Sequence, residues 1–179
     1  GPTMTQPPFP YFGGKQRIAR AIVEHFPRHL HYVEPYAGGL SVLLAKPRSR
    51  METVNDLSGD LMTFWRVLRD RPAELARVCA LTPHSRAELR NARDRDVDDE
   101  IERARRVWVC LTQGRAGGLV KTGWRHFVDA EAKGEFGMPD YLAAYVERLY
   151  GAAERLRDLC ELTERIEREM QDLPSIDFT

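Results

Sequence analysis

Residues 32–39, Tyr-Val-Glu-Pro-Tyr-Ala-Gly-Gly, and residues 55–56, Asn-Asp, are the most informative pair of motifs in this chain. Residues 31–33 predict a short buried strand that runs into the glycine turn, and residues 40–45 then predict a helix. Residues 52–56 predict a second strand, which gives the order strand, turn, helix, strand. This order predicts two parallel strands and therefore an α/β fold.

The same unit is suited to a nucleotide-like ligand. Gly38 and Gly39 let the backbone approach a ligand closely, and a carboxylate about twenty residues further on can accept both ribose hydroxyls. Asp56 is in that position. Glu34, just before the turn, suits the ammonium of a methionine moiety better than a phosphate. The alternative is an ordinary connector, in which Asp56 caps the helix that follows.

A second motif, Pro-Tyr-Phe-Gly-Gly-Lys, occupies residues 10–15 directly before a predicted helix. Backbone donors and Lys15 at a helix start could face an anion. The alternative is a Pro-flanked arm whose aromatic side chains attach it to the core. The residues alone leave both interpretations open.

Most of the remaining sequence predicts helices, separated by a glycine-rich loop or hairpin at residues 113–139. The predicted helices are residues 15–26, a helix from residue 59 with Leu61, Phe64, Trp65 and Leu68 on one face, residues 73–81, residues 85–111 with an interruption near 94–99, and residues 141 to about 170 as one helix or two.

Composition limits the class of protein. The chain has 179 residues, of which 42% are hydrophobic and 30% charged, and its formal net charge is zero. One domain with a real core is expected, and no apolar run is long enough to cross a bilayer. Net charge does not indicate nucleic-acid binding, which would need a local basic face. Gly1-Pro2-Thr3 resembles the remnant of a removed tag, and we expect a cytoplasmic protein.

No metal site or disulfide framework is expected. Cys79, Cys110 and Cys160 are odd in number and widely separated, and neither they nor the histidines show metal-ligand spacing. We interpret all three cysteines as reduced core thiols.

Together, Pro-Tyr-Phe-Gly-Gly-Lys, Val-Glu-Pro-Tyr-Ala-Gly-Gly and Asn-Asp resemble Dam-type DNA adenine methyltransferases, especially phage and prophage members, in order and spacing. The resemblance covers roughly residues 9–157 and implies a partial Rossmann-like sheet of two or three parallel strands with a mostly helical remainder. It also implies S-adenosylmethionine as cofactor, without a metal, and double-stranded DNA as partner.

The resemblance assigns residues to roles. Tyr11 and Lys15 would flank the cofactor, Glu34, Ala37 and Gly38 would hold its methionine part, and Asp56 would bind the ribose. Candidate DNA contacts are Arg115, Lys121, Trp124 and Arg125, for which the alternative is a solvated loop. The implied segments are an arm (1–8), a cofactor-binding segment (9–56), a target-recognition-like region (57–140) and a C-terminal helix and tail (141–179).

One feature of the family is absent from the sequence. The family holds the flipped adenine with an Asp-Pro-Pro-Tyr motif, and this sequence has none. The family also turns into a strand after residues 156–157, where residues 158–170 instead predict a charged helix. We therefore expect no catalytic residue and no turnover by this chain alone, and expect the C-terminal helix or another chain to cover the sheet edge. The alternative function is a non-catalytic module that binds DNA, cofactor or protein, as one half of a split enzyme, a decoy or a homo-oligomer.

Overall fold

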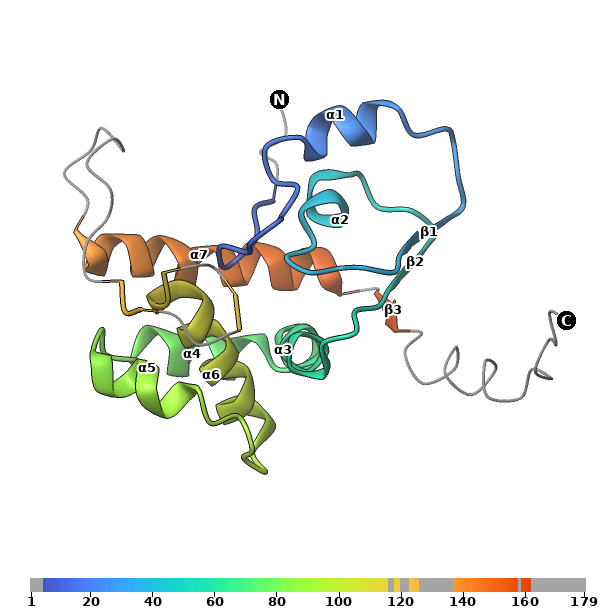
Figure 1. Cartoon of the computed structure of the whole chain (residues 1–179). Coiled ribbons are helices and arrows are strands. Elements are labelled where there is room, and N and C mark those ends of the chain that lie inside the picture. The colour runs from blue at the N-terminus through green and yellow to red at the C-terminus, as the bar shows by residue number, and fades with distance from the viewer. Residues whose placement is uncertain (1–4, 116–117, 120–122, 126–136, 158, 162–179) are drawn as a thin grey trace, which may run out of the picture.

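The computed structural model describes residues 5–115, 118–119, 123–125, 137–157 and 159–161, and it is of the mixed α/β class (Figure 1). Its parallel sheet has the order β1-β2-β3, formed by β1 (His31–Glu34), β2 (Met51–Val54) and β3 (Cys160–Glu161). His31 lies opposite Met51, and Thr53 lies opposite Cys160. The predicted α/β fold with two or three parallel strands is confirmed.

Helices make up most of the rest of the described chain. They are α1 (Ala19–Glu24), α2 (Ser41–Ala45), α3 (Gly59–Asp70), α4 (Pro72–Ala80), α5 (Arg86–Ala92), α6 (Glu100–Gln113) and α7 (Met138–Leu156). Figure 1 shows α1 and α2 beside the sheet, and α4 to α6 gathered at the other end of the molecule. Helix α7 runs along both groups. Within the described residues, no helix combines the length and apolar character needed to span a membrane.

Side-chain caps explain why the helical region is divided where it is. The Ser58 hydroxyl accepts a hydrogen bond from the Leu61 N–H at the start of α3, and Ser85 does the same for Glu88 at the start of α5. Asp99 caps α6 by accepting from the Ile101 N–H. Each cap satisfies a backbone donor that the first turn leaves unpaired. The predicted interruption near residues 94–99 is therefore confirmed.

The N-terminal arm is part of the core. Phe9 is 1% exposed, and its ring centroid lies 5.1 Å from that of Phe64 and 5.3 Å from that of Trp65. The indole N–H of Trp108 donates to the Pro8 carbonyl at 3.0 Å. The arm thus connects the glycine turn at residues 36–39 to the helices α3 and α6.

Two predicted helix boundaries are wrong. The first helix begins at Ala19 rather than Lys15, because residues after Gly14 form a turn in which the Ile18 N–H donates to the Lys15 carbonyl. The last helix ends at Leu156, and Cys160 and Glu161 pair with β2 as a parallel strand, so the helix predicted through residue 170 is wrong there. The strand implied by the family resemblance is present instead. Residues 162–179 lie outside the described chain.

A buried ionic triad, Lys46–Glu52–Arg155, attaches α7 to the sheet. Glu52 Oε1 lies 2.7 Å from Lys46 Nζ, and its two oxygens lie 2.5 and 2.7 Å from the Arg155 guanidinium. The three side chains are 2%, 6% and 8% exposed in sequence order. These contacts lower the pKa of Glu52 to about 2, although burial alone would raise it.

Candidate functional site

The glycine turn follows β1 at the carboxyl end of the sheet. The ladder between the strands continues past their ends, because the Asn55 N–H donates to the Glu34 carbonyl and the Ala37 N–H donates to the Asn55 carbonyl, both at 2.9 Å. Gly38 and Leu40 then take the left-handed conformation, with φ of 47° and 55°. Left-handed backbone at two nearby positions reverses the chain sharply before α2 begins.

Asp56 ties this turn to the end of β2. Its Oδ2 accepts a hydrogen bond from the Gly38 N–H at 2.9 Å, and its Oδ1 accepts one from the Ser58 N–H at 2.9 Å. An ionised carboxylate can accept about four hydrogen bonds, so Asp56 retains capacity for a ligand hydroxyl. On the far side of the turn, the Trp65 indole donates to the Gly38 carbonyl at 3.0 Å.

Glu34 is a buried acid at the end of β1, only 7% exposed. Its Oε2 accepts hydrogen bonds from the Tyr32 hydroxyl at 3.0 Å and from the Leu43 N–H at 3.2 Å. Burial raises the pKa of Glu34, and these hydrogen bonds and the charges of Lys15 and Lys46 only partly oppose that rise. A nearby cation would favour the ionised form of this carboxyl and so oppose the rise in its pKa.

Tyr11 covers the turn from the N-terminal side. Residues 11–14 form a tight turn, in which the Gly14 N–H donates to the Tyr11 carbonyl at 3.0 Å and Gly13 has a φ of 74°. The Tyr11 ring lies so close to Gly38 that a Cβ there would meet the ring at 2.8 Å. Partial burial and the charge of Asp56 raise the pKa of the Tyr11 phenol.

Five of the six candidate cofactor residues line one cavity of about 60 Å³, namely Tyr11, Lys15, Glu34, Ala37 and Gly38. The sixth, Asp56, supports this cavity from behind through Gly38. A second cavity of about 330 Å³ adjoins it and shares the residues Tyr11, Gly14, Gly39 and Ser41. The smaller cavity has room for only a few water molecules, and Tyr11 lines both spaces.

Comparison with known proteins agrees with this geometry. Residues 11–111 match the family described as D12 class N6 adenine-specific DNA methyltransferase. The chain belongs to this family. It is also 30% identical over 110 residues to Type II methyltransferase M1.LlaDCHI of Lactococcus lactis subsp. cremoris. That match covers 55% of this chain and 38% of the relative, so the chain spans little more than a third of the relative's length.

Membership of the D12 family implies the use of S-adenosylmethionine. The residues present fit that group, because a buried acid, a close glycine turn and a second acid converge at one strand edge, and the buried Oδ1 of Asn55 there has no hydrogen-bond partner in the described chain. No cluster of three or more His, Cys, Asp or Glu side chains suited to a metal occurs among the described residues.

The D12 match ends before the candidate DNA contacts. Arg115 and Arg125 lie on two paired segments, since the Arg115 N–H donates to the Gly123 carbonyl and the Arg125 N–H donates to the Gln113 carbonyl. Arg115 is exposed and Arg125 is half-buried, with its guanidinium 5.4 Å from the Tyr141 ring centroid. Lys121 lies outside the described residues.

Trp124 is packed rather than projecting. Its ring stacks on His84 at 4.5 Å and 19°, and the Arg86 guanidinium lies 5.2 Å from its centroid. A ring nitrogen of His84 lies 2.7 Å from the Arg125 carbonyl oxygen, which fixes this corner to the paired segments. Trp124 is therefore half-buried, and its ring packs beside arginine side chains.

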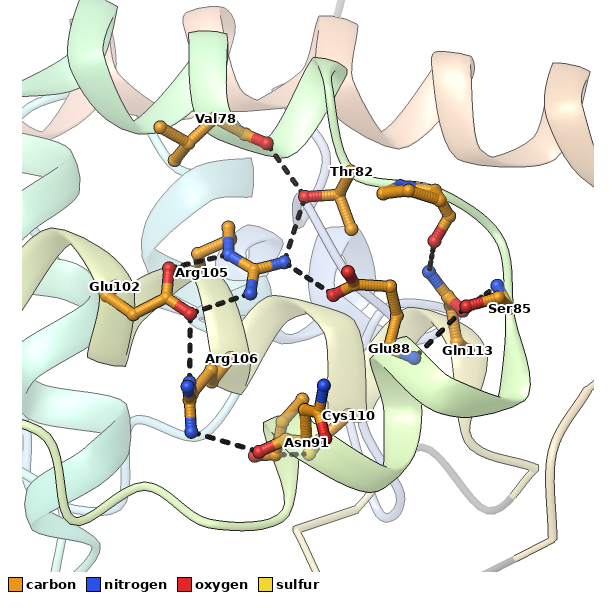
Figure 2. Close-up of polar contacts among 12 residues, drawn as sticks. Val78, Thr82, Ser85, Glu88, Asn91, Glu102, Arg105, Arg106, Cys110 and Gln113 are labelled. Atoms are coloured by element: carbon orange, nitrogen blue, oxygen red, sulfur yellow. Dashed lines mark hydrogen bonds and ion pairs between the residues drawn. The ribbon is translucent and has the colours of Figure 1, made fainter.

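A polar network holds α5 in place under this corner (Figure 2). The Arg105 guanidinium donates to Glu102 on its own helix, to Glu88 on α5 and to the Thr82 hydroxyl after α4. The Gln113 amide donates to the Pro83 carbonyl and accepts from the Ser85 N–H. These bonds fix the segment that carries His84 and Arg86.

Some site residues had little signal in the sequence. Ser41 is 8% exposed and lines both cavities, and only its place at the start of α2 could have indicated it. Trp65 supports the turn from α3, which no local motif reveals. Of the cysteines, Cys79 and Cys110 are buried free thiols as predicted, whereas nothing is described of the Cys160 side chain.

Proposed function

We propose that this chain binds S-adenosylmethionine at the carboxyl ends of β1 and β2 as the cofactor half of a D12 class DNA adenine methyltransferase. The observation that carries the proposal is the convergence of Tyr11, Lys15, Glu34, Ala37 and Gly38 on one cavity, with Asp56 directly behind it. The carboxyl ends of parallel strands are where open α/β sheets bind their ligands. The family match includes all six residues.

Each residue has a role in this proposal. Glu34 binds the ammonium of the methionine part, because a buried carboxylate gains most from a cation. Asp56 accepts the ribose hydroxyls with its remaining lone pairs, while Ala37 and Gly38 give close backbone approach. Tyr11 and Lys15 flank the entrance, and Tyr11 moves off Gly38 on binding. When bound, S-adenosylmethionine supplies an electrophilic methyl group.

The proposed substrate class is double-stranded DNA, with the exocyclic amine of adenine as the methyl acceptor. Arg115, Arg125 and Lys121 contact phosphates, and Trp124 is the apolar platform between them. In this division residues 9–56 bind the cofactor, residues 57–140 contact DNA, and residues 141–179 form the C-terminal helix and tail. Such a protein works in a bacterial or phage-infected cytoplasm.

We further propose that the chain alone does not transfer methyl groups. No Asp-Pro-Pro-Tyr occurs in the sequence, and an electrostatic clamp at a reacting group is typically worth ~10²–10³ in rate for a single donor. A second chain that carries the motif would complete the site. The same observation favours the second candidate function, a non-catalytic module that binds DNA, cofactor or another protein.

Calorimetric titration with S-adenosylmethionine tests the cofactor site. We expect micromolar binding, which corresponds to about 8 kcal/mol, and its loss in Asp56→Ala. Asp98→Ala is the matched control. Asp98 is exposed on the loop before α6, and its replacement by alanine removes the same charge as Asp56→Ala. Glu34→Gln should weaken binding while keeping the side-chain shape.

The outcomes separate the candidates. Binding by the parent chain and Asp98→Ala but not by Asp56→Ala supports the cofactor half, and a methylation assay on duplex DNA then tests turnover. Absence of binding up to millimolar cofactor rejects the methyltransferase mechanism for this chain. Retained DNA binding in that case would favour the non-catalytic module.

A further inference from the structure

A large groove lies at the end of the sheet opposite the proposed cofactor site. It has a volume of about 680 Å³, within the range of small-molecule sites. Its walls are the loop between α1 and β1, at residues 27–30, and the loop between α2 and β2, at residues 46–50 (Figure 1). Because β1 and β2 are parallel, both loops precede the amino ends of the strands.

Every charged side chain among the described residues that line the groove is a cation. These are Arg28, Lys46, Arg48 and Arg50. Arg28 and Arg50 are exposed, and within the described chain neither makes an ion pair. The Arg48 guanidinium is already held by the Glu154 carbonyl, which fixes it at the rim. The chain as a whole has a formal net charge of zero, so this cluster of cations is a local feature of the groove.

The buried triad adds positive charge behind the groove. Lys46 belongs both to the lining and to the Lys46–Glu52–Arg155 triad, in which two cations share one carboxylate. The triad therefore keeps a net charge of about +1 in a region with little water, where charge is screened weakly. An anion in the groove would be attracted by the exposed arginines and by this buried excess.

Part of the groove lining is apolar and includes one phenyl ring. Val23, Phe26 and Leu30 line the groove, and Leu30 is 71% exposed. The Phe26 ring also packs at 5.9 Å from His29, another lining residue. Apolar and cationic side chains in one groove suit a ligand that joins a planar apolar group to an anion.

We propose that this groove binds a nucleotide unit, with its phosphate on Arg28 and Arg50 and its base against Phe26 and Leu30. Arginine matches phosphate geometry with paired hydrogen bonds, and bases stack on aromatic side chains regardless of sequence. The unit is either a free nucleotide or a nucleotide at the end of a DNA strand. The groove shares no lining residue with the cavity of about 60 Å³ at Gly38, and the proposal does not depend on the cofactor function.

Calorimetric titration of the full chain with AMP tests the proposal, with inorganic phosphate, adenosine and a 5′-phosphorylated single-stranded oligonucleotide as parallel ligands. We expect AMP to bind more tightly than phosphate or adenosine. The double variant Arg28→Glu/Arg50→Glu should weaken AMP binding by about tenfold or more. Because both side chains are exposed, its circular dichroism spectrum should match that of the parent.

Control variants distinguish this site from other surfaces. Arg77→Glu/Arg90→Glu makes the same charge change on exposed residues of α4 and α5 and should leave AMP binding unchanged. Asp56→Ala should also leave it unchanged, since Asp56 belongs to the other end of the sheet. Leu30→Ser should weaken AMP binding but not phosphate binding.

Competition between AMP and the oligonucleotide would support one site that binds both ligands. The ligand that binds more tightly then shows whether the site takes a free nucleotide or the end of a DNA strand. Equal AMP affinity in the parent and in Arg28→Glu/Arg50→Glu would overturn the proposal. Phosphate or an acidic peptide binding as tightly as AMP would reject the nucleotide as occupant. Loss of AMP binding in Asp56→Ala would assign the nucleotide to the carboxyl-end pocket instead.

Discussion

Replacing Glu52 by Gln should strongly destabilise the protein. The substitution keeps the side-chain shape but leaves Lys46 and Arg155, which are 2% and 8% exposed, without their shared carboxylate. Breaking a buried pair from one side costs about 3–5 kcal/mol. The pKa of Glu52 gives a similar figure, because a fall from 4.5 to about 2 corresponds to about 3 kcal/mol at about 1.4 kcal/mol per unit.

The same linkage predicts how the effect depends on pH. A carboxyl with a lowered folded-state pKa contributes its full stability above the unfolded pKa, and loses it as pH falls through the folded pKa. For Glu52 that window extends from 4.5 down to about 2. The difference in unfolding free energy between parent and Glu52→Gln should therefore be largest at pH 7 and clearly smaller at pH 3.

Urea unfolding followed by tryptophan fluorescence measures this difference, because Trp65 and Trp108 are buried. The matched control is Glu74→Gln, which breaks the exposed Arg71–Glu74 pair and should change stability very little. A difference below about 1 kcal/mol at pH 7, or one that does not narrow at pH 3, would falsify the reasoning. Replacing all three triad residues by apolar ones should be nearly neutral.

Three further predictions concern the two surfaces. Gly38→Ala should lower the melting temperature and abolish cofactor binding, because its φ of 47° is strained for alanine and its Cβ would meet the Tyr11 ring at 2.8 Å; unchanged melting and binding would contradict the turn geometry. Binding of S-adenosylmethionine should weaken on acidification at a higher pH than an ordinary carboxyl implies, because burial raises the pKa of Glu34 and only the ionised form attracts the ammonium; Glu34→Gln should remove this dependence in calorimetry. Trp124→Ala should weaken binding of a labelled DNA duplex several-fold in fluorescence anisotropy, because it removes the apolar platform between the proposed phosphate contacts Arg115 and Arg125; equal affinity would favour a solvated loop.

The candidate site at the carboxyl ends of β1 and β2 was predictable because its determinants are local. The sequence shows a glycine turn between a strand and a helix, with an acid at the end of each strand. These residues are recognisable because each one acts through its own backbone or through the neighbouring strand. The sequence therefore predicts both strands and five of the residues that line the cavity. It could not predict that Tyr11 closes over Gly38, since that contact depends on how the arm folds back.

The C-terminal part was less predictable because its structure depends on distant partners. Residues 158–161, Asp-Leu-Cys-Glu, carry no signal that stops a helix, yet Cys160 and Glu161 pair with β2. A two-residue strand has almost no intrinsic preference, and tertiary pairing overrides it. Likewise, the sequence does not indicate that His84, forty residues before Trp124, packs against the face of its ring.

The bond between Arg155 and Glu52 joins residues 103 positions apart. At typical synthesis rates of about 5–20 residues per second, the ribosome needs on the order of 5–20 s to add that length. At the start of this interval β1, α2 and Lys46 have already been synthesised, whereas Arg155 has not, and the Trp108 bond to Pro8 also has to wait for residue 108. Helix α7 and strand β3 are therefore synthesised after β1 and β2, and the speed of translation through residues 53–155 sets how long Glu52 waits for Arg155.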